Sequence, residues 1–531
     1  MAFVLIGFMG AGKSTAAREL AAALGSEALD SDDLLTERFG HSPAREFELH
    51  GEAAFRASEQ QLVCELLDDG ERAGADAVIA LGGGSVLSER VRAALRGHVV
   101  VWLDIEAGTA WERVHARPGE RPLARDRDAF MALHAQRQTL YEERADAFLP
   151  TLARGTAARM LPALRALVAA PSGTRLLWAS ATSPSGDDAG GYPVLVGRGL
   201  LAEGGEERVA ATWPLDRERS RAFCVSDETV LALYGERLGE LAGALAIAPG
   251  ESHKTLASAE RVWQWLVEAQ ATRADHVVAL GGGVVGDLAG FCAATYQRGV
   301  PVVQVPTTLV AQVDSAYGGK TGVDLPQAKN YVGAYHQPAG VLVDPDLLAT
   351  LDPAELAAGW VEVLKTALIA GGRLWRAVAA GGEVDERMIL ECARTKLAVV
   401  AADERDGGRR QVLNLGHTVG HAIETATGYR RYRHGEAVGL GLLAALRLSG
   451  QEQLREQVRG LMAERGLPVT FDDDFYKDGS VDGVLEAIGK DKKRVGADAV
   501  PFVLVRAPGE VRHGCEVEPD ELRAAVRELA R

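Results

Sequence analysis

Residues 3–14 read FVLIGFMGAGKS, and this stretch decides the fold of the N-terminal part of the chain. The apolar run at its start predicts a buried strand, and the pattern from Ser14 to Leu24 predicts a helix directly after it. Between them, GFMGAGKS satisfies the phosphate-loop pattern GxxxxGK[ST]. Its glycines let backbone N–H groups turn toward phosphate oxygens, Lys13 reaches the β- and γ-phosphates, and Ser14 offers a hydroxyl to Mg²⁺. The stretch therefore predicts a nucleoside triphosphate site.

Alternation of strand and helix continues through much of the chain. Apolar runs near 3–6, 78–81 and 99–103 alternate with helical patterns such as 14–24 and 47–67, which indicates parallel βαβ units. A second alternating series begins near Tyr192, and beyond Leu351 the pattern is almost entirely helical. We therefore expect four segments: a P-loop kinase-like domain over 1–168, a linker over 169–175, a Rossmann-like α/β domain over 176–350 and an all-α domain over 351–531.

Composition narrows the classes of function. A formal net charge of −16 over 531 residues argues against a nucleic-acid-binding surface. The five cysteines are scattered and form no CxxC pair, which predicts neither a disulfide framework nor a thiolate zinc site, and a reducing, cytoplasmic setting fits. No apolar run reaches the roughly 18 residues that a membrane-spanning helix needs, so we expect no membrane association.

Further motifs follow the phosphate loop in order. They are Asp30-Ser31-Asp32, GEAAFRASE at 51–59, LGGGSV at 81–86, ERPL at 120–123 and RQTLY at 137–141. With the loop, they resemble shikimate kinase over the predicted first domain. The resemblance implies ATP-dependent phosphorylation of shikimate, with Asp32 near the accepting hydroxyl and Asp30 supporting Mg²⁺ through water. Two forked guanidinium groups suit the carboxylate of a small acid, whereas gluconate kinase is the alternative within the same P-loop class.

The resemblance also implies the individual contacts of the kinase site. ATP and its metal would be held by Gly10, Ala11, Gly12, Lys13, Ser14 and Thr15. The substrate would be held by Asp32, by Arg56 and Arg137 on its carboxylate, and by Gly83 and Gly84 against its ring, with Arg121 closing over ATP from a lid. Lys13, Asp32 and Arg121 would act in catalysis.

A second glycine cluster, GGGVVGD at 281–287, also lies between a predicted strand and a predicted helix. It has no lysine and no metal-binding hydroxyl, so it suits a pyrophosphate that is held and not cleaved, as in a nicotinamide dinucleotide. Taken alone, the pattern fits a packing turn equally well. Its neighbours are rich in polar residues and glycines: Arg298, VPTTLVAQVDSAYGGKTGVD at 305–324, Lys329-Asn330 and GAYHQP at 333–338.

These neighbours resemble 3-dehydroquinate synthase, from about Leu176 to Arg531. The resemblance implies NAD⁺ held by Asp227, Glu251, Lys254, Gly282, Gly283, Val284, Val285, Gly286, Asp287, Thr307, Thr308, Lys320 and Lys329. An acidic residue after the second strand of such a domain hydrogen-bonds ribose hydroxyls and disfavours a 2′-phosphate, so Asp227 indicates NAD over NADP.

Histidines cluster in the predicted helical domain. LNLGHTVGHAIE at 413–424 places His417 and His421 four residues apart on one helical face, and His434 follows. Spacing alone selects His417 and His421 as a zinc-binding pair. The resemblance instead implies Glu362, His417 and His434 as ligands of zinc or cobalt, with His421 beside the substrate phosphate. Three protein ligands leave a position open for substrate hydroxyls.

The remaining implied residues contact the substrate of the synthase. They are Arg298, Asp314, Lys320, Asn330, Lys365, Lys396, Arg410, Asn414 and His421, with Lys492 or Lys493 as a further contact. Of these, Lys320, Lys365, Lys396, Arg410 and His421 would act in catalysis. Converging cationic side chains in an acidic protein suit a doubly anionic sugar-acid phosphate. Asp406 and Asp324 stand where glutamate and asparagine are usual in the family.

Together the resemblances imply a bifunctional enzyme of aromatic amino-acid biosynthesis, with a homodimer formed through the synthase part. The synthase would convert 3-deoxy-D-arabino-heptulosonate 7-phosphate to 3-dehydroquinate, with NAD⁺ reduced and regenerated in each turnover. The alternatives are another sugar phosphate cyclase, a glycerol-dehydrogenase-like enzyme, or a half that serves only as a scaffold.

Overall fold

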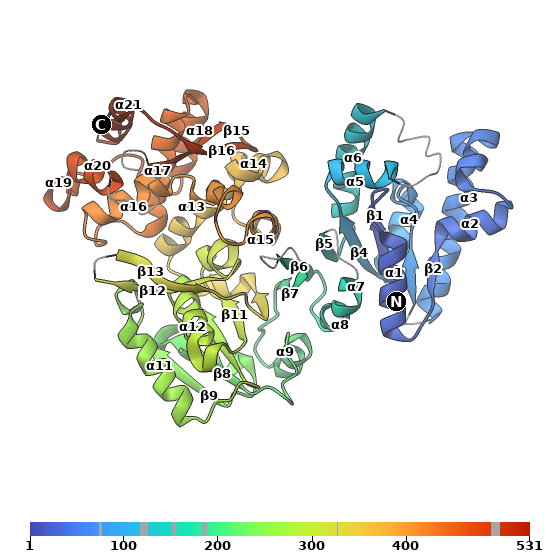
Figure 1. Ribbon diagram of the computed structural model, residues 1–531, viewed down its shortest axis with the longest axis horizontal. Helices are drawn as coiled ribbons and strands as arrows, with labels where there is room; N and C mark the ends of the chain where they lie inside the picture. Colours follow the sequence, from blue (N-terminus) through green and yellow to red (C-terminus); the bar gives the residue numbers. More distant parts are fainter. Residues whose placement is uncertain are drawn as a thin grey trace. The chain divides into compact units, whose positions relative to one another are not determined.

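The computed structural model describes residues 1–73, 77–116, 126–150, 155–182, 188–326, 328–489 and 500–530. Contacts divide the chain into a first unit, Met1–Leu195 with Ala211–Pro214, and a second unit, Val196–Ala210 with Leu215–Arg531 (Figure 1). Among the described residues, no helix combines the length and the apolar character that crossing a membrane requires. The five cysteines are free thiols.

The first unit is built on a sheet whose strands run in the order β2-β3-β1-β4-β5-β6-β7. The strands are β1 (Phe3–Gly7), β2 (Ala28–Asp30), β3 (Val78–Ala80), β4 (Val99–Asp104), β5 (Ala147–Pro150), β6 (Arg175–Thr182) and β7 (Asp188–Val196). Pairing from β2 through β6 is parallel. The central strand β1 is buried along its whole length, as the apolar run at 3–6 predicts.

Helices connect these parallel strands. They are α1 (Lys13–Leu24), α2 (Ser31–Phe39), α3 (Pro43–Ala73), α4 (Glu89–Ala94), α5 (Ala107–His115), α6 (Arg127–Glu142), α7 (Thr156–Arg159) and α8 (Leu161–Ala169), with the 3₁₀ turns η1 (Ser85–Leu87) and η2 (Leu95–Gly97). Helix α3 is interrupted at Gly51, whose φ of 81° is a left-handed conformation that favours glycine. Phe55 and Arg56 lie in the first turns of the part of the helix that follows this break.

The predicted linker and the strand after it lie in the first unit. Helix α8 ends at Ala169 and β6 begins at Arg175. Strand β6 pairs in parallel with β5, through Ala147 with Leu176 and Phe148 with Leu177, and both leucines are buried. The segment that sequence analysis assigned to the second domain therefore contacts the first unit up to Leu195, and the predicted boundary at 168 stays a prediction.

The second unit begins with a parallel sheet in the order β14-β11-β10-β8-β9. Its strands are β8 (Ala222–Asp227), β9 (Gly243–Ile247), β10 (His276–Gly281), β11 (Val302–Pro306) and β14 (Gly340–Val343), and a separate antiparallel pair is formed by β12 (Lys320–Leu325) and β13 (Ala328–Tyr335). The chain extends the sheet from β8 to β9 in one direction and from β10 to β11 in the other. Open α/β sheets bind ligands at such a change of direction, beyond the carboxyl ends of the strands.

Short connections and helices flank this second sheet. They are α9 (Glu206–Thr212), whose residues the contact division assigns to both units, α10 (Glu228–Tyr234), η4 (Gly235–Leu238), η5 (Glu251–His253), α11 (Leu256–Glu268), α12 (Gly283–Thr295), η6 (Tyr296–Arg298), the π-helical turn η7 (Ala311–Ser315) and η8 (Pro345–Thr350). A core of α11, α12 and strand residues, including Val262, Leu288 and Val302, is fully buried. Helix α12 packs against β12, beside which it lies in Figure 1.

Helices dominate the chain after Leu351, as predicted. They are α13 (Pro353–Ala370), α14 (Gly372–Ala379), α15 (Glu386–Ala402), η9 (Arg409–Asn414), α16 (His417–Ala426), α17 (His434–Leu448), α18 (Glu452–Ala463), α19 (Phe475–Asp478), α20 (Val481–Gly489) and α21 (Pro519–Glu528).

The expected all-α domain contains one β-hairpin. Strands β15 (Phe502–Ala507) and β16 (Glu510–Cys515) pair as an antiparallel hairpin between α20 and α21. Its buried residues Phe502, Val503 and Val505 do not alternate strictly, so the period-two pattern that identifies strands is weak. The Val505 N–H donates to the Ser449 hydroxyl at the end of α17 over 3.0 Å, a contact between distant segments. The hairpin is a departure from the expected all-α domain, whose other described elements after Leu351 are helices.

Candidate active sites

The phosphate loop joins β1 to α1 as the sequence predicts. Gly10 and Gly12 have φ of 83° and 92°. Gly12 directly precedes α1, and because it has no side chain, the first N–H groups of the helix receive no side-chain cap. The Lys13 ammonium donates to the carbonyls of Gly7 and Phe8, over 2.9 and 3.2 Å. The lysine is thus held over its own loop. A phosphate oxygen can replace one of these carbonyls as the hydrogen-bond acceptor of its ammonium group.

A cleft of about 810 Å³ opens beside this loop. It is lined by residues 9–16 and by Asp30, Asp32, Arg56, Gly83, Gly84 and Arg137. These are the residues that sequence analysis assigned to ATP, metal and acceptor, apart from the lid residue Arg121, which lies outside the described part of the chain. Asp30 also caps α2, because its carboxylate accepts the Asp32 N–H over 2.9 Å.

The glycines after β3 make room for the protein's own side chains. A Cβ at Gly84 would lie 2.6 Å from Arg56 Cζ, and one at Gly82 would lie 2.7 Å from Asp32 Oδ1. Arg56 donates from Nη1 to the buried Glu59 over 2.6 Å, and Glu59 also accepts from the Ser85 hydroxyl over 2.9 Å. Sequence analysis assigned the open space at Gly84 to the substrate ring, whereas here the Arg56 guanidinium fills it.

The second predicted arginine is held from α6. Arg137 is 4% exposed and donates from Nη1 to the Gly83 carbonyl over 3.3 Å, while its Nε has no hydrogen-bond partner among the described residues. Tyr141, one helical turn later, donates to the same carbonyl over 2.5 Å. Burial raises the pKa of Tyr141 to about 12, so this hydroxyl remains a donor at neutral pH. A buried guanidinium with an unused donor that lines the cleft fits an anionic ligand.

In the second unit, the predicted dinucleotide residues lie at the carboxyl edge of the sheet. Asp227, Gly281 and Thr307 end or follow β8, β10 and β11, which are neighbours, and the Thr307 N–H donates to the Gly281 carbonyl over 3.0 Å. Gly282 begins α12 and again has no capping side chain. The buried Thr307 hydroxyl has no partner among the described residues. An uncapped helix N-terminus beside a free donor fits a pyrophosphate.

Two of these residues also have contacts of their own. The Asp227 carboxylate caps α10 by accepting the Val230 N–H over 2.9 Å. A Cβ at Gly282 would lie 2.8 Å from Thr308 Cγ2, so the glycine is required for the packing of the loop.

A buried lysine organises the charges beside α12. Lys254 Nζ lies 3.0 Å from Glu251 Oε1, 3.3 Å from Asp287 Oδ2 and 2.8 Å from Asn330 Oδ1. Burial lowers the pKa of Lys254, but the carboxylates of Asp287, Glu251 and Asp324 outweigh it and raise the pKa above its usual value. Burial raises the pKa of Asp287 to about 6, against the lowering effect of Lys254. The carboxylates therefore keep the buried Lys254 ammonium protonated.

Asn330 is placed by strained backbone. Its φ is 56°, and its N–H donates to Asp324 Oδ1 over 2.8 Å. Asp324, at a position where the resemblance implies asparagine, thus accepts a hydrogen bond that an amide oxygen could equally accept.

The metal candidates meet between α13, α16 and α17. One ring nitrogen of each of His417, His421 and His434 lies within 4.8 Å of the other two. Glu362 Oε1 lies 3.6 Å from His417 Nε2 and 3.7 Å from His434 Nε2, and this buried oxygen has no hydrogen-bond partner among the described residues. A carboxylate and two imidazoles directed at one point are a donor set that suits zinc. The cluster contains both the pair chosen by spacing and the triad implied by resemblance.

Lysines surround Asp314 beside this cluster. Lys396 Nζ lies 2.7 Å from Asp314 Oδ1 and donates to the Asp314 carbonyl, and Lys365 Nζ lies 2.6 Å from Glu362 Oε2 and 3.9 Å from Asp314 Oδ2. Burial raises the pKa of Asp314, but Lys365 and Lys396 outweigh it and hold the pKa below its usual range. Burial lowers the pKa of Lys396. The two lysines form a buried cluster of opposite charges with Asp314 and Glu362 beside the metal candidates.

Lys320 and Arg410 are two further cationic residues of the predicted site. Lys320 pairs with Asp406 over 2.5 Å, and burial lowers the pKa of Lys320. Arg410 is 2% exposed, donates to the Gly318 carbonyl over 2.9 Å and keeps Nε without a partner among the described residues. Asp406 therefore forms the ion pair expected of a carboxylate at that position.

The structure does not bring every predicted residue to this cluster. Arg298 is exposed beyond the C-terminal end of α12, whereas Gly283 and Asp287 lie in its first turns. Asn414 is half-buried at the end of η9 and borders a small gap toward Phe502. Lys492 and Lys493 lie outside the described residues. The roles of these four residues stay predictions.

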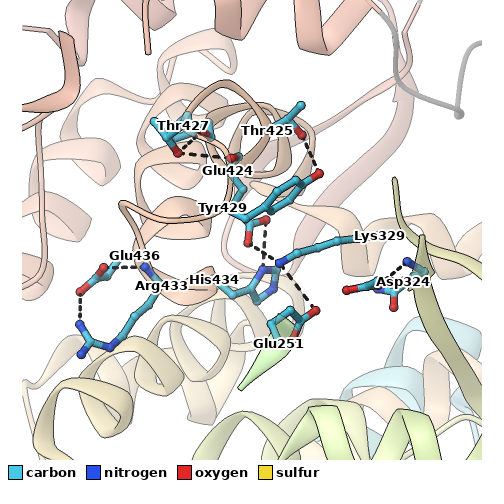
Figure 2. A network of polar contacts seen from close by, with 12 residues as sticks. Glu251, Asp324, Lys329, Glu424, Thr425, Thr427, Tyr429, Arg433, His434 and Glu436 are labelled. Carbon is cyan, nitrogen blue, oxygen red and sulfur yellow. Dashed lines mark hydrogen bonds and ion pairs between the residues drawn. The ribbon is translucent and has the colours of Figure 1, made fainter. Parts of the chain in front are cut away.

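Two buried carboxylates were missed by sequence analysis. Glu59 joins Arg56 to Ser85, and Glu424 lies between Lys329 and His434, over 3.2 and 3.5 Å (Figure 2). Burial raises the pKa of Glu424, but its contacts with His434 and Lys329 outweigh it and lower the pKa to about 2. Glu59 is three residues after Arg56, a helical spacing that brings these two side chains together. Spacing does not indicate the contact of Glu59 with Ser85 or those of Glu424 with Lys329 and His434, because these partners lie on other elements.

The geometry defines a class of protein. The first unit is a P-loop kinase fold with two arginines in the cleft beside the loop, and the second is a Rossmann-like enzyme with a histidine cluster that could hold a metal in its helical part.

Family models match both units: shikimate kinase over residues 9–164, 3-dehydroquinate synthase N-terminal over 244–358 and 3-dehydroquinate synthase C-terminal over 359–494. The 3-dehydroquinate synthase of Gloeobacter violaceus is 43% identical over 62% of this chain and 95% of its own length. That of Symbiobacterium thermophilum is 41% identical over 64% and 98%. The chain belongs to the 3-dehydroquinate synthase family and carries a shikimate kinase domain ahead of it.

Solved structures agree with the fold of the second unit. A 2-epi-5-epi-valiolone synthase from Streptomyces hygroscopicus with NAD⁺ and Zn²⁺ bound is 27% identical, with a TM-score of 0.57, and is matched over 64% of this chain and 96% of its own. A 2-deoxy-scyllo-inosose synthase complexed with carbaglucose-6-phosphate, NAD⁺ and Co²⁺ has the same TM-score at 23% identity, over 66% and 99%.

Proposed function

We propose that this chain catalyses two reactions of one pathway. The first unit phosphorylates shikimate with ATP and Mg²⁺, and the second converts 3-deoxy-D-arabino-heptulosonate 7-phosphate to 3-dehydroquinate and phosphate. The observation that carries the proposal is the arrangement of two separate anion-binding centres, each beside the cofactor loop that its chemistry needs. Relatives above 40% identity that carry the name of the second activity support it.

In the first unit, the roles follow from the cleft. Lys13 and the uncapped start of α1 bind the triphosphate, and Ser14 and Asp30 face its metal. Arg56 and Arg137 bind the acceptor's carboxylate, which places a ring hydroxyl at Asp32. Phosphoryl transfer depends mainly on positioning and charge neutralisation, so Glu59 and Tyr141, which hold these arginines and Gly83, support the geometry. Glu59 offsets one guanidinium charge, which leaves the cleft suited to a monoanionic acid.

In the second unit, the residues fit NAD⁺ and zinc. The start of α12 and Thr307 hold the pyrophosphate, and Glu362, His417 and His434 hold the metal. When bound, the dinucleotide supplies a hydride acceptor and donor, and the metal supplies a Lewis acid for the alcohol that is oxidised. Lys365, Lys396 and Arg410 orient the substrate's acidic groups, and the lowered pKa of Lys396 favours its part in proton transfer. His421 faces the leaving phosphate.

The test separates the two activities and the neighbouring cyclases. The purified chain is given NAD⁺ and Zn²⁺ with the heptulosonate 7-phosphate in one tube and with sedoheptulose 7-phosphate in another, and product and phosphate are identified. We expect 3-dehydroquinate from the first tube alone. Turnover of sedoheptulose 7-phosphate alone would assign the second unit to another cyclase. In parallel, Lys13→Ala is expected to lose ATP turnover with shikimate and to keep phosphate release from the heptulosonate. His434→Ala is expected to keep ATP turnover with shikimate and to lose phosphate release.

We also propose that the chain forms a homodimer through the second unit and works in the cytoplasm, as the resemblance implies. Gel filtration with light scattering tests the dimer.

A further inference from the structure

Glu424 is a buried carboxylate between the metal cluster and the dinucleotide end of the second unit. It lies on α16, is 3% exposed, and belongs to neither predicted ligand set. Its two oxygens point to different partners: Oε1 lies 3.2 Å from Lys329 Nζ and Oε2 lies 3.5 Å from His434 Nδ1 (Figure 2). A single side chain therefore contacts one residue of each cofactor site.

The contact with His434 constrains the ring. Nδ1 faces Glu424, whereas Nε2 lies 3.7 Å from Glu362 Oε1, on the side of the metal cluster. When Nδ1 carries the proton and donates it to a carboxylate, Nε2 is left with a lone pair for a cation. Glu424 therefore lies on the side of the ring from which a carboxylate favours the tautomer that a metal ligand needs.

The contact with Lys329 continues toward the dinucleotide end. Lys329 Nζ lies 3.6 Å from Glu251 Oε1 and 4.6 Å from the centre of the Tyr429 ring. Glu251 in turn pairs with Lys254, which pairs with Asp287 in the first turns of α12. A continuous series of opposite charges therefore runs from the start of α12 to His434, and Glu424 is its link between β13 and α17.

We propose that Glu424 is a positioning residue that couples the two cofactor sites, orienting His434 for the metal and Lys329 for the dinucleotide. The inference rests on the proposed function of the second unit. Coupling between binding sites is reciprocal, so occupation of the dinucleotide site, by ordering Lys329, tightens metal binding, and metal tightens NAD⁺ binding by the same factor.

The test measures binding and not turnover. Zn²⁺ affinity of the chelator-stripped full chain is measured by competition with a chromogenic chelator, with and without saturating NAD⁺, and NAD⁺ affinity is measured by calorimetry with and without Zn²⁺. In the unaltered chain we expect the two ligands to strengthen each other by about fivefold or more. In Glu424→Gln we expect Zn²⁺ affinity to fall roughly 10–100-fold and the mutual effect to disappear.

A matched control comes from the same neighbourhood. Glu436 lies two residues after His434, but its carboxylate accepts the Arg433 N–H over 2.8 Å at the start of α17. Glu436→Gln is therefore expected to keep both affinities and their coupling. Glu424→Asp, which keeps the charge on a shorter side chain, is expected to restore part of the Zn²⁺ affinity, and thermal unfolding of the metal-free chains shows that each variant is folded.

The outcomes are distinct. Zn²⁺ affinity in Glu424→Gln within twofold of the unaltered chain would overturn the inference, as would weakened Zn²⁺ binding with the mutual effect intact. An unaltered chain that makes 3-dehydroquinate but shows no mutual effect would also overturn it while leaving the proposed function in place. An unaltered chain that binds no NAD⁺ would remove the proposed function itself.

Discussion

Gly84 must lack a side chain, because the Arg56 guanidinium lies where a Cβ at this position would be. In Gly84→Ala the new methyl would lie 2.6 Å from Arg56 Cζ, so the arginine must move. We expect the KM for shikimate to rise roughly tenfold or more, while the KM for ATP stays unchanged, as steady-state kinetics would show.

The role of Arg56 is checked directly by Arg56→Lys, which keeps the positive charge but loses the forked guanidinium. A KM for shikimate in Gly84→Ala within twofold of that of the unaltered chain would contradict the role given to Arg56.

The carboxylate of Asp275 should make the free energy of unfolding of the second unit depend on pH. It is 4% exposed, pairs with Arg221 over 2.8 Å and accepts the Thr272 N–H over 2.7 Å. Burial raises its pKa, but these hydrogen bonds outweigh it and lower the pKa from 3.8 to about 2. A depressed carboxylate pKa stabilises the fold above the unfolded-state pKa, and this contribution is lost as the pH falls through the folded-state value.

We therefore expect Asp275→Asn to destabilise the second unit by roughly 1–2 kcal/mol at pH 7. The difference from the unaltered chain should be unchanged at pH 5 and should shrink between pH 4 and pH 2. Urea unfolding followed by circular dichroism at each pH measures this. A difference that grows on acidification would contradict the assigned sign.

The sequence predicted best those site residues that belong to short motifs. Lys13, Asp32 and Glu362 belong to short motifs, so pattern and resemblance could nominate them from the sequence, and their roles stay predictions. Glu59 and Glu424 were missed because their importance depends on burial beside a partner from another segment, which spacing alone does not reveal.

At the scale of elements, two helical glycines should respond to alanine with opposite signs. A Cβ at Gly290 in α12 would lie 2.5 Å from Thr321 Cγ2 of β12, so alanine must separate the helix from this strand. Overpacking of this kind costs roughly 1–3 kcal/mol. Because β12 begins at Lys320, we also expect weaker NAD⁺ binding in Gly290→Ala.

Gly460 in the exposed face of α18 meets no atom within 4 Å. Gly460→Ala should stabilise the chain by roughly 0.5–1 kcal/mol through the higher helix propensity of alanine. Thermal unfolding measures both variants, and destabilisation by Gly460→Ala would contradict the open environment described for it.

Helices and strands were predicted well where the hydrophobic pattern extends over a long run of residues. The helix predicted over 14–24 is α1, and the strand over 99–103 is β4. The hairpin β15–β16 was missed because its pairing is decided by contact with α17, and its hydrophobic pattern does not alternate strictly.

On the scale of the whole molecule, β6 makes the first unit depend on residues beyond the kinase motif. Leu176, Leu177 and Trp178 are buried, and Arg175 pairs with Asp146 before β5 over 3.2 Å. A chain ending at Ala170 would leave the outer edge of β5 unpaired, which favours aggregation.

We therefore expect residues 1–170 to unfold roughly 4–10 °C below residues 1–196. Both should retain shikimate-dependent ATP turnover, because β6 lines no part of the cleft. Differential scanning calorimetry provides the measurement, and equal midpoints would show that β6 adds nothing to the first unit.

The sequence by itself determined the P-loop, the order of the α/β segments and the histidine cluster, because each is a local pattern of backbone freedom or periodicity. Only the tertiary structure decided that Arg56 fills the space left by Gly84, that β6 completes the first unit and that Glu424 joins the two cofactor sites. The reason is physical: these features are contacts between segments far apart in the chain, and their energies depend on burial and direction, which only the packed fold defines.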